Sequence, residues 1–400
     1  MNKKKLLIPA IGAAIALLAL AVTVLFIAPA LRKPVIAYYR LPANVRAALS
    51  ALADDPALSG KTKFGIVVLD DSKGLAEQLA KKPRVDVVFA YDGAAAAETA
   101  GKALAPSEQI KQLMAPAIQQ AGKVRSDSYG MPLLLDHFEV AYNKDLFAKA
   151  GYAEPKKLDD LVKAAQKTAR KGLWPIVCAG ANDKDLLMLV GALAEARHGA
   201  TARAGIVADL REKGSFEAAL GNKALRGTLD ELVSWRKSGL LHPEWFRMQD
   251  KDVSAFMENE YTCVVFMPLS THRTIPLKTI AKFASIPFPP ASVGLPREIT
   301  APVVVGVLPS YKKPNATAAD FLYRLARAEG QTILSAETGL APVNSTAETQ
   351  DIQATDIRVW AAASSRPVPD PATDAFADPA KIAATARSVR AYIEANGAGF

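Results

Sequence analysis

The sequence predicts an α/β protein built on parallel sheets. Apolar, strand-like runs at residues 34–41, 63–69 and 85–90 alternate with segments of helical apolar spacing at 45–52 and 74–80. Strands and helices that alternate with short connections are typical of a doubly wound sheet. The chain has 400 residues and is 50% hydrophobic, so it can bury cores for two or three folding units.

Polar residues follow the strands of this N-terminal part. Tyr39 and Arg40 end the first strand, Asp70 and Asp71 the second, and Tyr91-Asp92 the third. Ligands of such sheets meet the carboxyl ends of the strands, which makes Tyr39, Arg40, Tyr91 and Asp92 candidate binding residues. Solvated turns explain the same polar residues, and this second interpretation stays open.

The remaining elements follow from the same two periodicities. An extended stretch is expected at 131–142 and strands at 174–179, 261–267, 286–290 and 303–308; helices are expected at 155–171, 183–197, 223–237, 320–328 and 379–395. Pro287, Pro289 and Pro290 confine residues 286–290 to a sheet edge or to a crossover, because proline cannot donate to a strand ladder.

The first 33 residues predict export. Lys3, Lys4 and Lys5 precede an uncharged run at 6–31, which reaches ~39 Å as a helix and could cross a bilayer. Positive charge before the run places the N-terminus in the cytoplasm and the rest of the chain outside it. The segment is either a signal anchor or a signal peptide cleaved near Ala30. No cysteine follows it that could carry a lipid.

Charge and cysteine content narrow the possibilities further. The net charge is +9, and without Lys3, Lys4, Lys5, Arg32 and Lys33 about +4 remains, spread among interspersed acids and bases. Such a surface does not predict nucleic-acid binding. The two cysteines, Cys178 and Cys263, lie in apolar runs. Both buried free thiols and a disulfide are compatible with that placement.

Several motifs in fixed order resemble one protein family. The stretch YGMPLLLDHFEVAYNKDLF, from Tyr129 to Phe147, is followed by Gly151, by Pro155 and by an amphipathic helix. Further matches are KSGLLHP at 237–243, AFM at 255–257, and AEGQ at 328–331 followed by ETGLAPV at 337–343. This ordered set, from Val85 to Val343, resembles family 1 extracellular solute-binding proteins, the receptors of ABC importers for sugars and related solutes.

The resemblance implies a two-lobe periplasmic-binding-protein fold (type II-like) with a ligand cleft between the lobes. The first lobe would contain residues 34–135 with about 275–330, and the second 136–274 with about 331–400. Residues 133–140 and 286–308 would be passages that bend as the receptor closes. The implied function is capture of a small solute, a sugar or polyol, and its delivery to ABC permease subunits, by a monomer that needs no cofactor.

Further candidate ligand residues come from the implied cleft. Asp136 and His137 lie on the expected passage, where a carboxylate can bind hydroxyls or form a hinge salt bridge. Ser270, His272 and Arg273 follow the strand at 261–267, in a segment where the family has a Gly-rich turn with an aromatic residue; a surface turn is the alternative there. Trp174 and Phe376 are candidate stacking rings, although an aromatic residue beside proline, such as Trp174, more often packs in the core.

Catalysis is not predicted. The sequence contains no G-x-S-x-G, H-E-x-x-H, P-loop or dinucleotide motif, and its four histidines (137, 198, 242 and 272) do not have metal-ligand spacing. Adjacent Asp pairs point to different faces and do not form one acid–base centre. The function that competes with a transport receptor is a membrane-anchored sensor or interaction module on the same fold.

Overall fold

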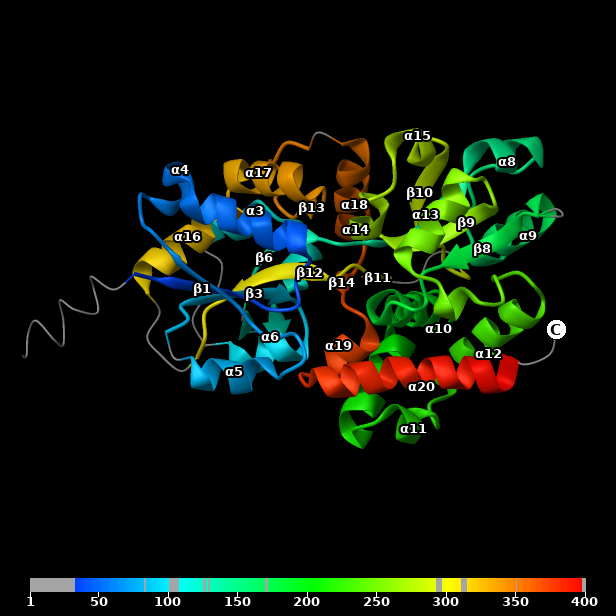
Figure 1. The fold of residues 1–400 in the computed structure, drawn as a ribbon, viewed down its shortest axis with the longest axis horizontal. Helices are drawn as coiled ribbons and strands as arrows, with labels where there is room; N and C mark the ends of the chain where they lie inside the picture. Colours follow the sequence, from blue (N-terminus) through cyan, green and yellow to red (C-terminus); the bar gives the residue numbers. More distant parts are fainter. Residues whose placement is uncertain are drawn as a thin grey trace, which may run out of the picture.

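The computed structural model describes residues 33–82, 84–100, 108–124, 127–128, 130–169, 172–292, 297–310, 315–349 and 351–397. The predicted export segment at 6–31 lies outside these residues. Figure 1 shows two lobes side by side, each with its own sheet. The mixed α/β fold that the sequence predicts is confirmed.

The first lobe contains a six-stranded sheet in the order β13-β6-β12-β3-β1-β2. Strand β1 runs parallel to both β2 and β3, as the alternating pattern predicts, whereas β12 is antiparallel to β3 and β6. The strands are β1 (Val35–Tyr38), β2 (Gly65–Val68), β3 (Val87–Tyr91), β6 (Gly130–Leu135), β12 (Val303–Val307) and β13 (Ala341–Pro342).

Helices cover both faces of this sheet (Figure 1). Side chains of β1 alternate between the two faces: Ile36 and Tyr38 join one hydrophobic cluster, Ala37 and Tyr39 another. Helices α3 (Ala43–Asp54), α16 (Ala316–Ala326) and α17 (Ala328–Thr338) supply the first cluster, and α5 (Leu75–Lys81) supplies the second. Shorter elements of this lobe are α4 (Pro56–Ser59), α6 (Ala94–Thr99), α7 (Glu108–Gln112), η2 (Ile118–Gln120), β4 (Lys123–Val124) and β5 (Asp127–Ser128).

Strand β2 differs from its expected environment. Its β-branched run indicates burial on both faces, but Ile66 is 42% and Val68 55% exposed. The reason is topological: β2 lies at the edge of the sheet, and the sequence of a strand does not show whether a neighbour will cover it.

The second lobe contains a four-stranded sheet in the order β10-β7-β9-β8. Its strands are β7 (Phe138–Asn143), β8 (Trp174–Cys178), β9 (Thr262–Pro268) and β10 (Phe283–Pro287). Strand β10 lies at the edge, where Pro287 is tolerated, as predicted. The helices of this lobe are α8 (Lys144–Lys149), α9 (Leu158–Thr168), α10 (Asp183–Lys213), α11 (Phe216–Ala219), α12 (Lys223–Lys237), η3 (Trp245–Arg247), α13 (Asp250–Glu258), α14 (Leu269–His272), α15 (Leu277–Ile280), α19 (Pro371–Ala375) and α20 (Pro379–Gly397).

The chain passes between the sheets three times. The extended stretch at 131–142 is two strands: β6 ends at Leu135, β7 begins at Phe138, and Asp136 and His137 form the passage between them. The second passage leaves β10 and the third follows α18 (Ile352–Ala363). These two are joined by a parallel pair, β11 (Glu298–Thr300) with β14 (Arg366–Val368).

The expected division between lobes needs two corrections. Residues 283–287 were expected in the first lobe, but β10 pairs with β7 of the second. Residues 341–342 were expected in the second lobe, but β13 pairs with β6, and α17 and α18 contribute to the core of the first. Strand pairing decides lobe membership, and pairing between distant segments is not visible in their local pattern.

Two further expectations concern cysteine and membrane helices. Cys178 and Cys263 are both buried and are not joined by a disulfide, which agrees with the thiol interpretation. Burial raises the pKa of the Cys178 thiol well above its usual value. In the part of the chain that the structure describes, no helix combines the length and the apolar composition required to cross a bilayer.

Candidate functional site

A cleft divided into three cavities lies between the lobes. The first cavity has a volume of about 90 Å³, the second about 610 Å³ and the third about 70 Å³. Lys184 lines both the first and the second, while Gly93 and Pro369 line both the first and the third. Their shared wall residues place the three cavities side by side in one cleft, and each has walls from both lobes.

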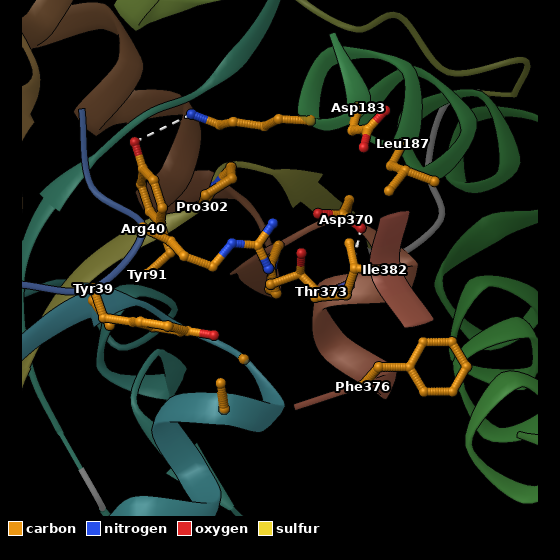
Figure 2. Close-up of a pocket in the computed structure, with 15 residues that line it drawn as sticks. Tyr39, Arg40, Tyr91, Asp183, Leu187, Pro302, Asp370, Thr373, Phe376 and Ile382 are labelled. Atoms are coloured by element: carbon orange, nitrogen blue, oxygen red, sulfur yellow. Dashed lines mark hydrogen bonds between the residues drawn. The ribbon is translucent and has the colours of Figure 1, made fainter. Parts of the chain in front are cut away.

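The first cavity collects four of the predicted residues. Tyr39, Arg40 and Tyr91 come from strand ends of the first lobe, and Phe376 follows α19 of the second lobe (Figure 2). The other described wall residues are Ala90, Gly93, Ala95, Asp183, Lys184, Leu187, Pro302, Pro369, Asp370, Thr373 and Ile382. Most of this wall is aromatic or aliphatic, which suits the apolar face of a small solute.

Arg40 has an unusual backbone conformation beside this cavity. Its φ is 53°, in the left-handed region that an arginine rarely adopts. The Arg40 amide donates to Asp71 Oδ1 at 2.7 Å, which holds the turn after β1. Figure 2 shows the Arg40 side chain crossing the cavity toward Asp370 and Thr373 of the opposite wall. Strain of this kind persists where the surrounding structure determines it, and it is frequent at binding sites.

A buried polar cluster separates the first two cavities. Asp136, on the first passage between the lobes, is fully buried. Its Oδ2 lies 2.5 Å from Lys184 Nζ and accepts from the Tyr91 hydroxyl at 2.9 Å. The backbone N–H of Ser270 donates to Asp136 Oδ1 at 2.8 Å, and the Ser270 hydroxyl to Oδ2 at 2.9 Å. Two predicted residues, Tyr91 and Asp136, therefore contact a lysine that the sequence analysis did not select, and a third, Ser270, binds Asp136.

The electrostatics of this cluster favour its charged form. Burial acts to raise the pKa of Asp136, but the Lys184 ammonium and the hydrogen bonds from Lys184 and Ser270 outweigh it and lower that pKa. Burial acts to lower the pKa of Lys184, but Asp136 and Tyr91 raise it. Burial raises the pKa of Tyr91, which stays protonated. The cluster thus presents the Lys184 ammonium to both cavities, the Tyr91 phenol to the first and Ser270 to the second, with Asp136 buried behind them.

Asp370 forms the opposite wall of the first cavity. It is the N-cap of α19, and its Oδ1 accepts from the amides of Ala372 at 3.0 Å and Thr373 at 2.9 Å. Burial raises the pKa of Asp370, although these hydrogen bonds and Arg40 act in the opposite direction. The Asp370 carboxyl group is therefore a hydrogen-bond acceptor held in a fixed position at the N-terminus of α19.

The second cavity is polar. From the second lobe it is lined by the N-terminal turns of α10 and α13 and by α14; from the first lobe by the start of α3 and the end of α17. The described wall residues are Pro42, Asn44, Asn182, Lys184, Asp185, Asp250, Ser270, Thr271, Arg273, Thr274, Glu337, Thr338 and Gly339. Ser270 and Arg273 are the predicted residues among them.

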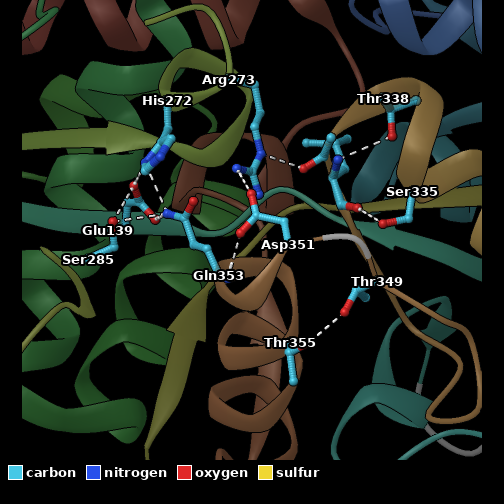
Figure 3. A network of polar contacts seen from close by, with 12 residues as sticks. Glu139, His272, Arg273, Ser285, Ser335, Thr338, Thr349, Asp351, Gln353 and Thr355 are labelled. Carbon is cyan, nitrogen blue, oxygen red and sulfur yellow. Dashed lines mark hydrogen bonds and ion pairs between the residues drawn. The ribbon is translucent and has the colours of Figure 1, made fainter. Parts of the chain in front are cut away.

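Arg273 ties the two lobes together at this cavity (Figure 3). Its Nε donates to the Gly339 carbonyl oxygen at 2.8 Å, and its Nη1 pairs with Asp351, the N-cap of α18. Arg273 belongs to the segment after β9, whereas Gly339 and Asp351 belong to the first lobe. The residue predicted as a ligand contact is therefore already engaged in an interlobe bond.

The third cavity contains the predicted residue Asp92. It is also lined by Arg211, Arg366 and Asp374, so acids and bases of both lobes face each other there. Burial raises the pKa of Asp92 to about 7, although a hydrogen bond from the Gly122 amide, 3.3 Å long, acts to lower it. Within the described residues, no group of three or more His, Cys, Asp or Glu side chains is placed to hold a metal ion.

Besides the buried Asp136, three predicted residues line none of these cavities. His137 stacks on Trp360 at 5.4 Å and lines a separate space of about 10 Å³. Trp174 packs against His242, with ring centroids 4.6 Å apart. His272 Nδ1 lies 2.5 Å from Glu139 in a buried network with Gln353 and Ser285 (Figure 3). Their positions beside strand ends or on a passage were visible in the sequence, but the direction of each side chain was not.

Sequence reasoning missed Lys184, Asp185, Asp250 and Asp370. The sequence did contain a signal for Lys184 and Asp185. They lie where strand β8 leads into the N-terminus of helix α10, just as Tyr39 lies between strand β1 and helix α3. Asp250 and Asp370 lie after loops, where the pattern contains no information about what faces the cleft.

Comparison with known proteins identifies the family. A family model described as "Bacterial extracellular solute-binding protein" matches residues 70–359. The chain belongs to this family. No curated protein matches the sequence.

Solved structures of solute-binding proteins share this fold. The chain resembles the bacterial solute receptor AcbH with a TM-score of 0.72 and 15% identity, over 90% of this chain and 92% of that one. It resembles the binding protein msme from Bacillus subtilis with a TM-score of 0.69 and 13% identity, over 91% and 96%. RafE, solved in complex with raffinose, gives a TM-score of 0.63 and 15% identity, over 91% and 100%. The expected two-lobe solute-binding fold is thereby confirmed.

Proposed function

We propose that this chain is the extracytoplasmic receptor of an ABC importer and that it captures a sugar or polyol between its lobes. The observation that carries the proposal is the cleft, whose polar centre joins groups from both lobes: Tyr91 and Asp136 from one side, Lys184 and Ser270 from the other. A solute that binds these groups favours the closed arrangement, because it contacts both walls only when the lobes are together.

The chemistry of the first cavity supports a polyhydroxyl ligand. Charged groups with fixed geometry, such as Lys184, Arg40 and Asp370, form strong hydrogen bonds to hydroxyl groups. Aromatic and aliphatic side chains beside them can cover the apolar face of a sugar ring. The AcbH structure is described as having an exclusive preference for β-D-galactopyranose, and RafE was solved with raffinose. Those ligands motivate the choice of solutes to test.

Delivery to a permease and membrane attachment belong to the same proposal. The predicted export segment would bring the receptor to the outer side of the membrane, either tethered by residues 6–31 or released after cleavage near Ala30. Tethering would keep the receptor beside its permease without a lipid group. A monomer is sufficient for this role, since each cavity of the cleft is lined by residues of one chain.

The test is a thermal-shift screen of the purified chain against galactose, glucose, raffinose and small polyols. A solute that binds only the folded state raises stability by about 2.7 kcal/mol at a hundredfold excess over Kd. We expect at least one sugar to raise the melting temperature and Lys184→Met to abolish the shift. If none of the sugars or polyols has an effect, the proposal is wrong.

A further inference from the structure

The second cavity has an excess of acid on its walls. Asp185 in α10 and Asp250 in α13 face it from the second lobe, and Glu337 and the C-terminal end of α17 from the first. The end of a helix bears partial negative charge. The two basic residues of the wall have acidic partners, Lys184 with Asp136 and Arg273 with Asp351, and Arg273 Nη2 is a further donor without a hydrogen bond among the described residues.

Asp185 is unusual among the buried acids of this site. It is 0% exposed, no N–H or O–H group of the described residues donates to its carboxyl oxygens, and its neighbour is a second acid, the carboxyl group of Asp250. Asp136, equally buried, accepts four. Positions in the first turn of α10 and α13 favour carboxylates electrostatically, but they have not given Asp185 a donor. A buried carboxyl without a donor is costly, so its presence in the wall of a cavity indicates a missing partner.

We propose that the second cavity binds a primary ammonium group of the solute, held by Asp185 and Asp250. This inference rests on the proposed receptor function and narrows its ligand to amine-bearing solutes. An ammonium group brings three donors and a positive charge, whereas a hydroxyl would leave the two acids uncompensated. The cavity, at about 610 Å³, leaves room for the rest of such a molecule.

The proton balance of this binding follows from the groups that face Asp185. Burial and the neighbouring Asp250 raise the pKa of Asp185, while Lys184 lowers it and Asp136 raises it further. Burial also raises the pKa of Asp250, which accepts from Thr271 at 3.4 Å. Cys178 is a neutral thiol. Both acids are therefore protonated more readily than free carboxyl groups. A proton on the pair competes with the ammonium and leaves to solvent when the ammonium binds.

The test is calorimetric titration of the full chain with three probes: glucosamine, glucose and the diamine putrescine. Glucose is the hydroxyl counterpart of glucosamine, and putrescine has amines without a sugar. We expect glucosamine to bind at least tenfold more tightly than glucose. Its affinity should rise with pH, because protons compete with the ammonium for the two acids, and binding should release protons, measured in buffers of different ionisation enthalpy.

Two variants and one control separate the site from general effects. Asp185→Asn and Asp250→Asn should each remove the preference for the amine and the proton release. Asp160→Asn is the matched control, because Asp160 is an exposed acid in the first turn of α9 and lines none of the cleft cavities; it should bind like the wild type. If Asp185→Asn does not fold, the Asp250→Asn variant and the proton release of the wild type still test whether the second cavity binds an amine.

The outcomes distinguish this inference from the proposed function. Equal binding of glucose and glucosamine, or a preference that survives Asp185→Asn, overturns the amine site and leaves the sugar receptor intact. Binding of putrescine alone supports the amine site and overturns the sugar class. No binding by any probe overturns both.

Discussion

The first and second cavities of the cleft share Lys184 but differ in every other respect. The first is small, about 90 Å³, and its wall is mostly aromatic and aliphatic; the second is large, about 610 Å³, and its wall is polar and charged. Lys184, Asp136, Tyr91 and Ser270 stand between them as a network in which Asp136 is fully satisfied. The difference shows how one cleft can separate two tasks: shape selection beside an apolar wall, and charge selection beside unsatisfied acids.

The largest expected effect comes from removing the residue that both cavities share. Lys184→Met leaves Asp136 buried without its cation, and breaking one partner of a buried pair costs about 3 to 5 kcal/mol. Urea denaturation should show this loss, and it should be smaller at low pH, where Asp136 can take up a proton. The double variant Lys184→Met/Asp136→Asn should recover most of the stability. Wild-type stability in the single variant would show that the cluster does not support the cleft.

The next effect concerns His137, the residue that follows Asp136 in the chain. The His137 side chain lines neither the first nor the second cavity. Burial lowers the pKa of His137 to about 4, below its unfolded value. A base with a lowered folded pKa contributes stability that is complete above the unfolded pKa and is lost as pH falls toward 4. Over that interval the loss is about 3 kcal/mol, at about 1.4 kcal/mol per pKa unit.

His137→Phe removes this pH dependence and keeps a ring against Trp360. Because other groups also titrate, the measurement is the difference between wild type and variant in urea denaturation at about pH 7 and about pH 4. The wild type should lose about 3 kcal/mol more than the variant. Parallel losses in both proteins would mean that His137 is not buried neutral, and ligand affinity at neutral pH should be the same in both.

The smallest effect concerns contact between the lobes at the first cavity. Gly93 has φ 143°, and a Cβ there would lie 2.7 Å from the Thr373 carbonyl oxygen of the opposite lobe. Gly93→Ala should therefore hold the lobes apart, at a cost of about 1 to 3 kcal/mol, and weaken solute binding about 5- to 150-fold. In the presence of solute, small-angle scattering should show a larger radius of gyration for Gly93→Ala than for the wild type.

Gly74→Ala is the control for this substitution. A Cβ at Gly74 meets nothing within 4 Å, and its φ of −57° suits alanine. This variant should bind and scatter like the wild type. If Gly93→Ala also binds normally, the two lobes do not need to meet at the first cavity, and the separation of tasks between cavities loses its geometric basis.

Part of the site was predictable from local pattern. Tyr39, Arg40 and Tyr91 follow strands whose apolar runs are plain in the sequence, and the carboxyl-end rule places them at one edge of a sheet. Asp136 was found through the motif around the first passage. Trp174 shows the limit of this reasoning. It lies at the start of a strand, but its ring packs on His242 inside the second lobe. The sequence pattern does not show which side chains face the other lobe.

The sequence by itself determined the α/β class, many of the helices and most strands, and an N-terminal segment suited to export, since periodicity and charge are properties of neighbouring residues. The helices α17 and α18 were not predicted. The tertiary structure decided that β2 is an edge, that β10 belongs to the second lobe and that Lys184 meets Asp136. Such facts depend on contacts between residues far apart in the sequence. Lys184 and Asp136 are 48 residues apart, and Ser270, which also binds Asp136, is 134 residues from it. Contacts at such separations depend on how whole sheets pack, and no local period records them.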